Sequence, residues 1–285
     1  MAIDYKKLKN REFGEVEHTY TSRDTMLYAL GVGVGSDPLN RSALRFVYED
    51  GLQALPTMGA VLAHPGFWLK EPDTGVDWTK VLHADQEIVL HHPLPVEGTV
   101  KATTKIDEII DKGKGKGAFI YSSRQVSTDD GEPLCTLRQT TMLREQGGFN
   151  GPNIKPPPYQ PIPAADPHWT CTMSTLPQAA LIYRLSGDYN PLHADPDVAE
   201  SAGFKQPILH GLCTFGVAGY AILSSCCDFN ASRLHSIRAR FSAPVIPGEA
   251  ILTQIWRLDS SSVAFRCLVV GRDQVVLDNG YAKLS

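Results

Sequence analysis

The stretch "ILHGLCTFGVAGYAILSSCC", residues 208–227, limits how the rest of the chain can fold. It contains no Asp, Glu, Lys or Arg, so a helix formed here is apolar on every side. Such a helix either crosses a membrane or is buried in a core. His210 and three glycines interrupt the stretch, Pro207 precedes it, and no second stretch of this kind exists. We therefore expect a core helix covered by a sheet, and no membrane span.

Segments with the alternating pattern of β-strands occur in both halves of the chain. They lie at residues 98–109, 117–127 and 134–143, and again at 235–244, 248–258, 263–271 and 274–284. Runs of strands beside an apolar helix favour an α+β fold with antiparallel sheets. A sheet curved around a buried helix is the hot-dog architecture. We expect a double hot-dog, in which each of two antiparallel sheets wraps around a long central helix.

The two halves have their elements in the same order. "PTMGAVLAHPG", residues 56–66, occupies the place in the first half that "PILHGLCTFGVAGYAIL", residues 207–223, occupies in the second. Gly98 and Gly248 each begin a strand after a proline-containing turn. These correspondences predict a duplicated structural unit.

A proline-rich segment separates the halves. Residues 147–167 contain seven prolines and three glycines, a composition that excludes regular helix or central strand over most of the segment. We therefore expect an N-terminal half at 1–146, a linker at 147–167 and a C-terminal half at 168–285.

Charge and cysteine content restrict the partners and the location. The 27 Lys and Arg against 31 Asp and Glu leave a net charge of −4, which does not favour nucleic acid over the whole surface. The six cysteines show no metal-binding spacing and are typical of reduced thiols in a cytoplasmic protein. The charged N-terminus has no apolar signal region, and the chain ends in Lys-Leu-Ser, which is not the peroxisomal Ser-Lys-Leu.

The polar stretch "SGDYNPLHADP", residues 186–196, carries the candidate catalytic groups. Asn190-Pro191 turns the chain between Asp188 and His193, so that both side chains can meet one water as acid and base. Asn190 can hold that water or brace the loop. Two alternatives are a polar helix stop formed by Asp188 and a metal site formed by His193 with Asp195. No third ligand is evident, so we expect no metal, and Asp195 is better explained as a helix N-cap.

The longer stretch "YRLSGDYNPLHADPDVAESAGF", followed by "PILHGLCTFG", resembles the hydratase 2 motif of the (R)-specific, MaoC-like enoyl-CoA hydratases. Three first-half stretches, "LYALGVG", "LPTMG" and "HHPLP", extend the resemblance to the double hot-dog hydratase domain of peroxisomal multifunctional enzyme type 2. We expect this domain to stand alone, as in a bacterial-type enzyme.

The resemblance implies a lyase that reversibly hydrates trans-2-enoyl-CoA by syn addition to give (3R)-3-hydroxyacyl-CoA. Asp188 and His193 would be catalytic, in an order of proton transfers that is left open, and Asn190 would position groups. The backbone N–H of Gly211 would stabilise the oxyanion, as the free N–H groups at a helix start allow. The resemblance also implies a coenzyme A thioester as substrate, no cofactor, a homodimer, and a role in β-oxidation or in polyester precursor supply.

Other residues are weaker candidates for binding CoA. Arg238 and Arg240 alternate on one strand and share a face that can meet phosphates or simply face solvent. Lys114 lies in the turn "DKGKGKG", and Glu49 lies in "FVYEDG", where a surface turn is the simpler explanation. Since the first half lacks the Asp-Asn-His pattern, we expect it to be non-catalytic and to accommodate the acyl chain.

Two rival functions remain on the sequence alone. A hot-dog acyl-CoA thioesterase would direct the activated water at the thioester carbonyl and release a thiol. A non-catalytic acyl-CoA-binding protein would need no Asp-Asn-His pattern, so the presence of Asp188, Asn190 and His193 argues against it.

Overall fold

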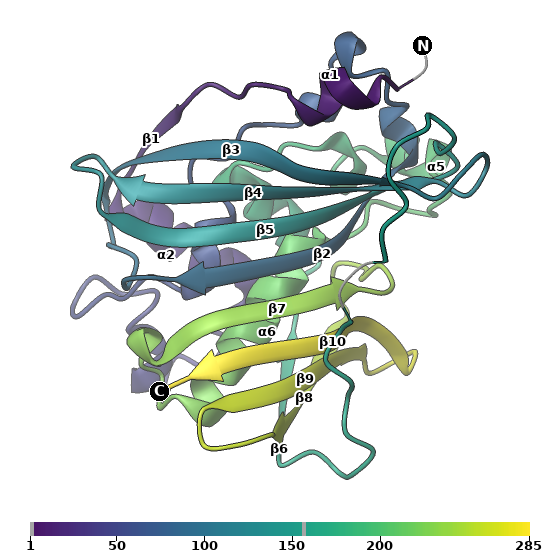
Figure 1. Ribbon diagram of the computed structural model, residues 1–285. Helices are drawn as coiled ribbons and strands as arrows, with labels where there is room; N and C mark the ends of the chain where they lie inside the picture. Colours follow the sequence, from purple (N-terminus) through teal and green to yellow (C-terminus); the bar gives the residue numbers. More distant parts are fainter. Residues whose placement is uncertain (1–2, 156–157) are drawn as a thin grey trace.

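The computed structural model describes residues 3–155 and 158–285. Their antiparallel strands form one continuous curved sheet in the order β1-β3-β4-β5-β2-β7-β10-β9-β8-β6 (Figure 1). The strands are β1 (Val16–Tyr20), β2 (Val81–Leu90), β3 (Gly98–Asp111), β4 (Ala118–Thr128), β5 (Pro133–Leu143), β6 (Trp169–Ser174), β7 (Leu234–Phe241), β8 (Ala250–Arg257), β9 (Ser262–Val269) and β10 (Gln274–Leu284).

The same strand order occurs in each half of the sheet. If the five strands of each half are numbered along the chain, both halves follow the order 1-3-4-5-2. The second strands of the two halves, β2 and β7, pair with each other in the middle, with Gln86 opposite Ala239. This repeated order confirms the predicted duplication and the double hot-dog fold.

The helices lie mainly against the inner face of the sheet, and α6 is the longest of those described. They are α1 (Tyr5–Lys9), α2 (Ser22–Val32), α3 (Arg41–Leu44), α4 (Ala179–Tyr183), α5 (Pro196–Ser201) and α6 (Gly211–Cys226). Every residue of α6 from Cys213 to Leu223 is buried, as predicted for a helix that is apolar on all sides. Among residues 3–155 and 158–285, no helix combines the length and the apolar character needed to cross a bilayer.

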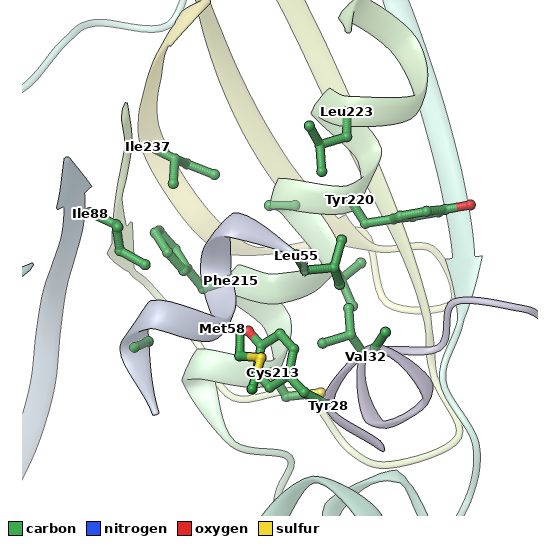
Figure 2. Packing of buried hydrophobic residues seen from close by; sticks show 14 of the residues in the cluster. Tyr28, Val32, Leu55, Met58, Ile88, Cys213, Phe215, Tyr220, Leu223 and Ile237 are labelled. Atoms are coloured by element: carbon green, nitrogen blue, oxygen red, sulfur yellow. The ribbon is translucent and has the colours of Figure 1, made fainter. Parts of the chain in front are cut away.

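Helix α6 joins the cores of the two halves. Figure 2 shows Phe215 and Tyr220 of α6 among side chains of the first half, including Val32, Leu55 and Ile88. The helix approaches its neighbours closely, because a Cβ added at Gly219 would lie 2.5 Å from the methyl carbon of Thr57. Helix α6 therefore packs against side chains of both halves within one core.

The prediction of a long central helix in the first half is wrong. Residues 56–66 contain only the 3-10 turn η1 (Pro56–Ala60). Pro56 begins this turn, and Pro65 disfavours helical geometry at the residue before it, so the apolar stretch between them is too short for a long helix. Ala63 also has a positive φ of 45°. A long helix therefore does not occupy the space beside this short turn.

The described residues of the proline-rich segment 147–167 form neither helix nor strand. The segment contacts the sheet through backbone carbonyls, because the side chain of Asn279 donates to Gln160 and the indole of Trp256 donates to Ala165. Pro156 and Pro157, which belong to the predicted linker, lie outside the described residues.

Candidate active site

The loop between α4 and α5 positions the predicted catalytic residues. Helix α4 passes into the 3-10 turn η5 (Arg184–Ser186) and then into Gly187, whose φ of 122° is in the region that favours glycine. Asn190 next caps the 3-10 turn η6 (Pro191–His193) by accepting from the Leu192 amide at 3.2 Å. The chain therefore turns sharply between Asp188 and His193, as the Asn-Pro pair predicts.

This turn brings the side chains of Asp188 and His193 together. A carboxylate oxygen of Asp188 and one ring nitrogen each of His193 and His210 all lie within 4.8 Å of one another. The Asp188 side chain also accepts a hydrogen bond from the Asn190 amide at 3.2 Å, so part of the predicted polar helix stop is present as well. The distance between the acid and the imidazole is suited to a single bridging water.

Hydrogen bonding determines which nitrogen of His193 is available. Its Nδ1 lies 2.8 Å from the backbone oxygen of Ile208, and because a carbonyl can only accept, Nδ1 carries the proton. Nε2 then has a free lone pair. Burial lowers the pKa of His193, while the bond to Ile208 and the charge of Asp188 oppose that shift. The net direction favours a neutral ring that can accept a proton.

His210 is a site residue whose role the sequence analysis did not predict. Its ring stacks on that of His193, with centroids 3.8 Å apart and an interplanar angle of 29°. Its Nε2 donates to the backbone oxygen of Asp188 at 3.1 Å. Burial, followed by the neighbouring His193, lowers the pKa of His210 to about 4. A neutral His210 therefore contacts both predicted catalytic residues. The sequence signal for the role of His210 was its position directly before Gly211, the predicted oxyanion donor.

The cluster of Asp188, His193 and His210 contains ligand types that zinc accepts, but its geometry does not fit a shared metal. An ion bound by both imidazoles must lie close to both ring planes at about 2 Å from each nitrogen. Rings stacked face to face direct their lone pairs along nearly parallel planes, so these do not meet at bonding distance. The absence of a metal stays a prediction.

The start of α6 provides free backbone donors beside this cluster. His210 is the N-cap, and its oxygen accepts from Cys213 and Thr214. The N–H groups of Gly211 and Leu212 meet no acceptor among the described residues. A Cβ added at Gly211 would lie 3.0 Å from a ring carbon of Phe241. The absence of a side chain at Gly211 therefore allows this end of the helix to lie close to Phe241 of the sheet. Unpaired N–H groups are expected at a helix start, because they have no acceptor within the helix.

A cavity of about 470 Å³ adjoins the loop that carries Asp188 and Asn190. The second half contributes residues 187–190 and Leu212 to its wall. The first half contributes the rest, from the segment that follows η1 and from strands β2, β3, β4 and β5. The cavity therefore lies beside the short turn that replaces the predicted long helix.

Two further histidines, His64 and His83, line this cavity. Burial is the main cause that lowers the pKa of each, and the charge of Asp188 opposes it. The accessible surface of His64 lies in the cavity wall, where the neighbouring protein still desolvates the ring and lowers its pKa. The cavity is therefore lined by neutral imidazoles near Asp188.

The four weaker candidates for CoA binding do not line the cavity. Arg238 forms an ion pair with Asp85 at 3.1 Å and lies over the ring of Tyr159, which Arg240 also faces. The two arginines thus share one face, as predicted. Lys114 and Glu49 are exposed in turns. Contact between these residues and CoA stays a prediction for the part of the substrate outside the cavity.

Comparison with protein families divides the chain in the same way as the sheet. Residues 18–145 match the MFE-2 hydratase 2 N-terminal domain, and residues 158–278 match the MaoC like domain. The second match includes the loop between α4 and α5 and the start of α6.

Similar proteins match over nearly the whole chain. Enoyl-CoA hydratase ChsH3 of Mycobacterium tuberculosis is 39% identical over 98% of both chains. 3-hydroxyacyl-thioester dehydratase Y of the same organism is 42% identical over 92% of this chain and 91% of its own. The crystal structure of a MaoC-like dehydratase from Phytophthora capsici has a TM-score of 0.87 and 33% identity, covering 99% and 98% of the two chains.

The full-length peroxisomal multifunctional enzyme type 2 of Drosophila melanogaster also matches, with a TM-score of 0.82 and 33% identity. The match covers 95% of this chain and 48% of that one, so the chain corresponds to about half of the larger enzyme. The chain therefore belongs to the MaoC-like hydratase 2 family and is a lyase of the hydratase type.

Proposed function

We propose that the protein catalyses the reversible syn hydration of trans-2-enoyl-CoA to (3R)-3-hydroxyacyl-CoA. The observation that carries the proposal is the convergence of Asp188 and His193 within 4.8 Å beside a helix start with unpaired N–H groups. The names of two similar proteins, an enoyl-CoA hydratase and a 3-hydroxyacyl-thioester dehydratase, describe the two directions of one reaction.

Hydration requires a water held on one face of the double bond. Asp188 and His193 hold it between them, and the Nε2 lone pair of His193 is free to take part in proton transfer. As the water oxygen bonds to C3, one of the pair takes its proton and the other delivers a proton to C2. Because both groups act from one face, the addition is syn.

The electron pair of the double bond moves toward the thioester oxygen during this step. The oxygen gains negative charge, and the N–H of Gly211 at the positive end of α6 stabilises it. The side-chain N–H₂ of Asn190 has no partner among the described residues and faces the same cavity, so Asn190 orients the water or the thioester. A lone pair of the water forms the C3–O bond and the π electrons form the C2–H bond, so the hydration involves no net oxidation or reduction and calls for no redox cofactor.

The acyl chain occupies the cavity in the first half. That cavity adjoins Asp188 and the end of η1, the short turn found where a long helix was predicted. The first half therefore has a binding role and no catalytic groups of its own. We also propose that the enzyme is a homodimer, which sedimentation analysis would establish.

The test is to incubate the protein with trans-2-enoyl-CoA, follow the loss of enoyl absorbance and determine the configuration of the product. We expect the (3R) product without release of free thiol. A (3S) product, or no reaction at any chain length, would contradict the proposal. Thiol release from a saturated acyl-CoA would instead support a thioesterase.

A further inference from the structure

The wall of the cavity includes a buried cation, Arg124 of β4, that has no counter-ion among the described residues. The side chain is 7% exposed, and its Nη2 donates to the backbone oxygens of Ala60 at 2.6 Å and Gly59 at 3.3 Å. Its Nε is buried without a partner, and no carboxylate lies within ion-pair distance among residues 3–155 and 158–285. Burial lowers the pKa of Arg124 to about 10, so it remains charged at neutral pH.

A buried guanidinium without a carboxylate is energetically unfavourable. Removing a charge from water is costly, and buried charges in proteins are normally paired. Two half-buried arginines of this chain are paired in this way, in the ion pairs Arg238–Asp85 and Arg266–Asp278. The two carbonyl groups at the end of η1 compensate only part of the charge of Arg124. The unpaired charge lines the cavity, where a bound anion can complete the pairing.

The neighbouring wall of the cavity is also polar. Ser122 on β4 lies opposite Gln139 on β5, and Gln139 lies opposite Gln86 on β2, so three polar side chains form one row across three strands. All three line the cavity. Along β4, this polar section lies between the buried apolar residues Ile120 and Val126. A pocket for a plain hydrocarbon chain would continue the apolar lining instead.

We propose that the cavity binds an acyl chain whose far end carries an anionic group such as a carboxylate, and that Arg124 selects this group. The inference rests on the proposed function, because the hydrated bond must lie beside Asp188. Arg124 and Asp188 both lie close enough to His64 to alter its pKa, after the larger effect of burial. Arg124 and Asp188 therefore both lie near His64 in the wall of one cavity, so a single bound substrate can contact both.

The anion is the end of the acyl chain and not a phosphate of CoA. The nucleotide part of CoA carries several strongly hydrated charges, whose burial beside a residue that is 7% exposed would be very costly. It also lies at the opposite end of the substrate from the acyl terminus. A single carboxylate can accept from the guanidinium N–H groups that the carbonyls of Gly59 and Ala60 leave free.

The test compares two trans-2-enoyl-CoA series of matched chain lengths, one ending in a carboxylate and the other in a methyl group. The readout is the ratio of kcat/KM values for each pair, because a general structural defect lowers both values by the same factor. We expect the wild type to favour the carboxylate by about 10-fold or more at its best length. The variant Arg124→Gln should lose this preference, and Arg124→Lys should retain part of it.

Two results would overturn the inference. One is a wild type that hydrates the methyl-ended series equally well or better at every length. The other is an equal loss on both series in Arg124→Gln, which would assign Arg124 to holding η1 or to contacting CoA. If neither series is hydrated, the proposed function fails. Calorimetry then tests Arg124 separately, by comparing the binding of a saturated acyl-CoA that ends in a carboxylate with that of one that ends in a methyl group.

Discussion

The imidazole ring of His210 stacks on that of His193 at a centroid distance of 3.8 Å. The same ring donates from Nε2 to the backbone oxygen of Asp188. His210 thus contacts the two proposed catalytic residues. Because its own pKa is about 4, the ring is neutral at neutral pH and does not serve as a general acid there. We assign it a positioning role.

Replacing His210 with Phe should keep an aromatic ring against His193 while removing the hydrogen bond to Asp188. Because small displacements of catalytic groups are costly, we expect kcat to fall about 10- to 100-fold while KM changes little. Steady-state kinetics would measure both constants. Unchanged kcat in a folded variant would show that the bond to Asp188 is not needed.

The pH dependence of activity follows from the lowered pKa of His193. The folded ring stays neutral below the ordinary histidine pKa of about 6.5 and becomes protonated only at lower pH. We therefore expect kcat/KM to decrease with falling pH along a limb whose midpoint lies below about 6.5. The variant His193→Gln should lack this limb. A midpoint at or above the ordinary value would contradict the assigned environment.

The variant Gly211→Ala tests the oxyanion donor. Its Cβ would meet the ring of Phe241 at 3.0 Å, so either the ring or the helix start must move. Displacement of the N–H should lower kcat by about 100-fold, the usual effect of losing one such donor. In the double variant with Phe241→Leu, space is restored, and activity should partly recover. Full activity of Gly211→Ala alone would argue against this donor.

The contact between α6 and η1 makes a prediction about stability. Gly219→Ala should destabilise the fold by about 1 to 3 kcal/mol in urea unfolding, although alanine favours helix formation, because the new methyl group would overlap Thr57. Adding Thr57→Ser removes the clashing methyl and should restore most of the loss. Equal instability with and without Thr57→Ser would place the cause elsewhere.

Much of the fold was predictable from local patterns. The apolar stretch at 208–227 predicted α6, and alternation predicted seven of the strands, because burial on one face leaves a period-two signal. Strands β1 and β6 were not predicted, and neither was β2. It lies in the middle of the sheet beside β5 and β7, and its sequence "VLHADQEIVL" is interrupted by Asp85 and Gln86, which are buried. The ion pair of Asp85 with Arg238 makes that burial possible, and only the tertiary structure reveals it.

The candidate site was predictable where its residues adjoin in sequence. Asp188, Asn190 and His193 lie in one loop, and Gly211 begins the next long helix. His210 and Arg124 were not predicted, because each acts through partners far along the chain. His210 bonds to Asp188, and Arg124 bonds to Gly59 and Ala60. A long helix predicted at residues 56–66 would also have filled the space in which the cavity lies.

The most direct test of the account is hydration of trans-2-enoyl-CoA by Asp188→Asn and His193→Gln beside the wild type. Both substitutions keep the side-chain size nearly constant, and thermal melting would verify folding. We expect kcat to fall about 100-fold or more in each variant, the effect of losing a general acid or base. Near-full activity in either folded variant would contradict the claim that this pair activates the water.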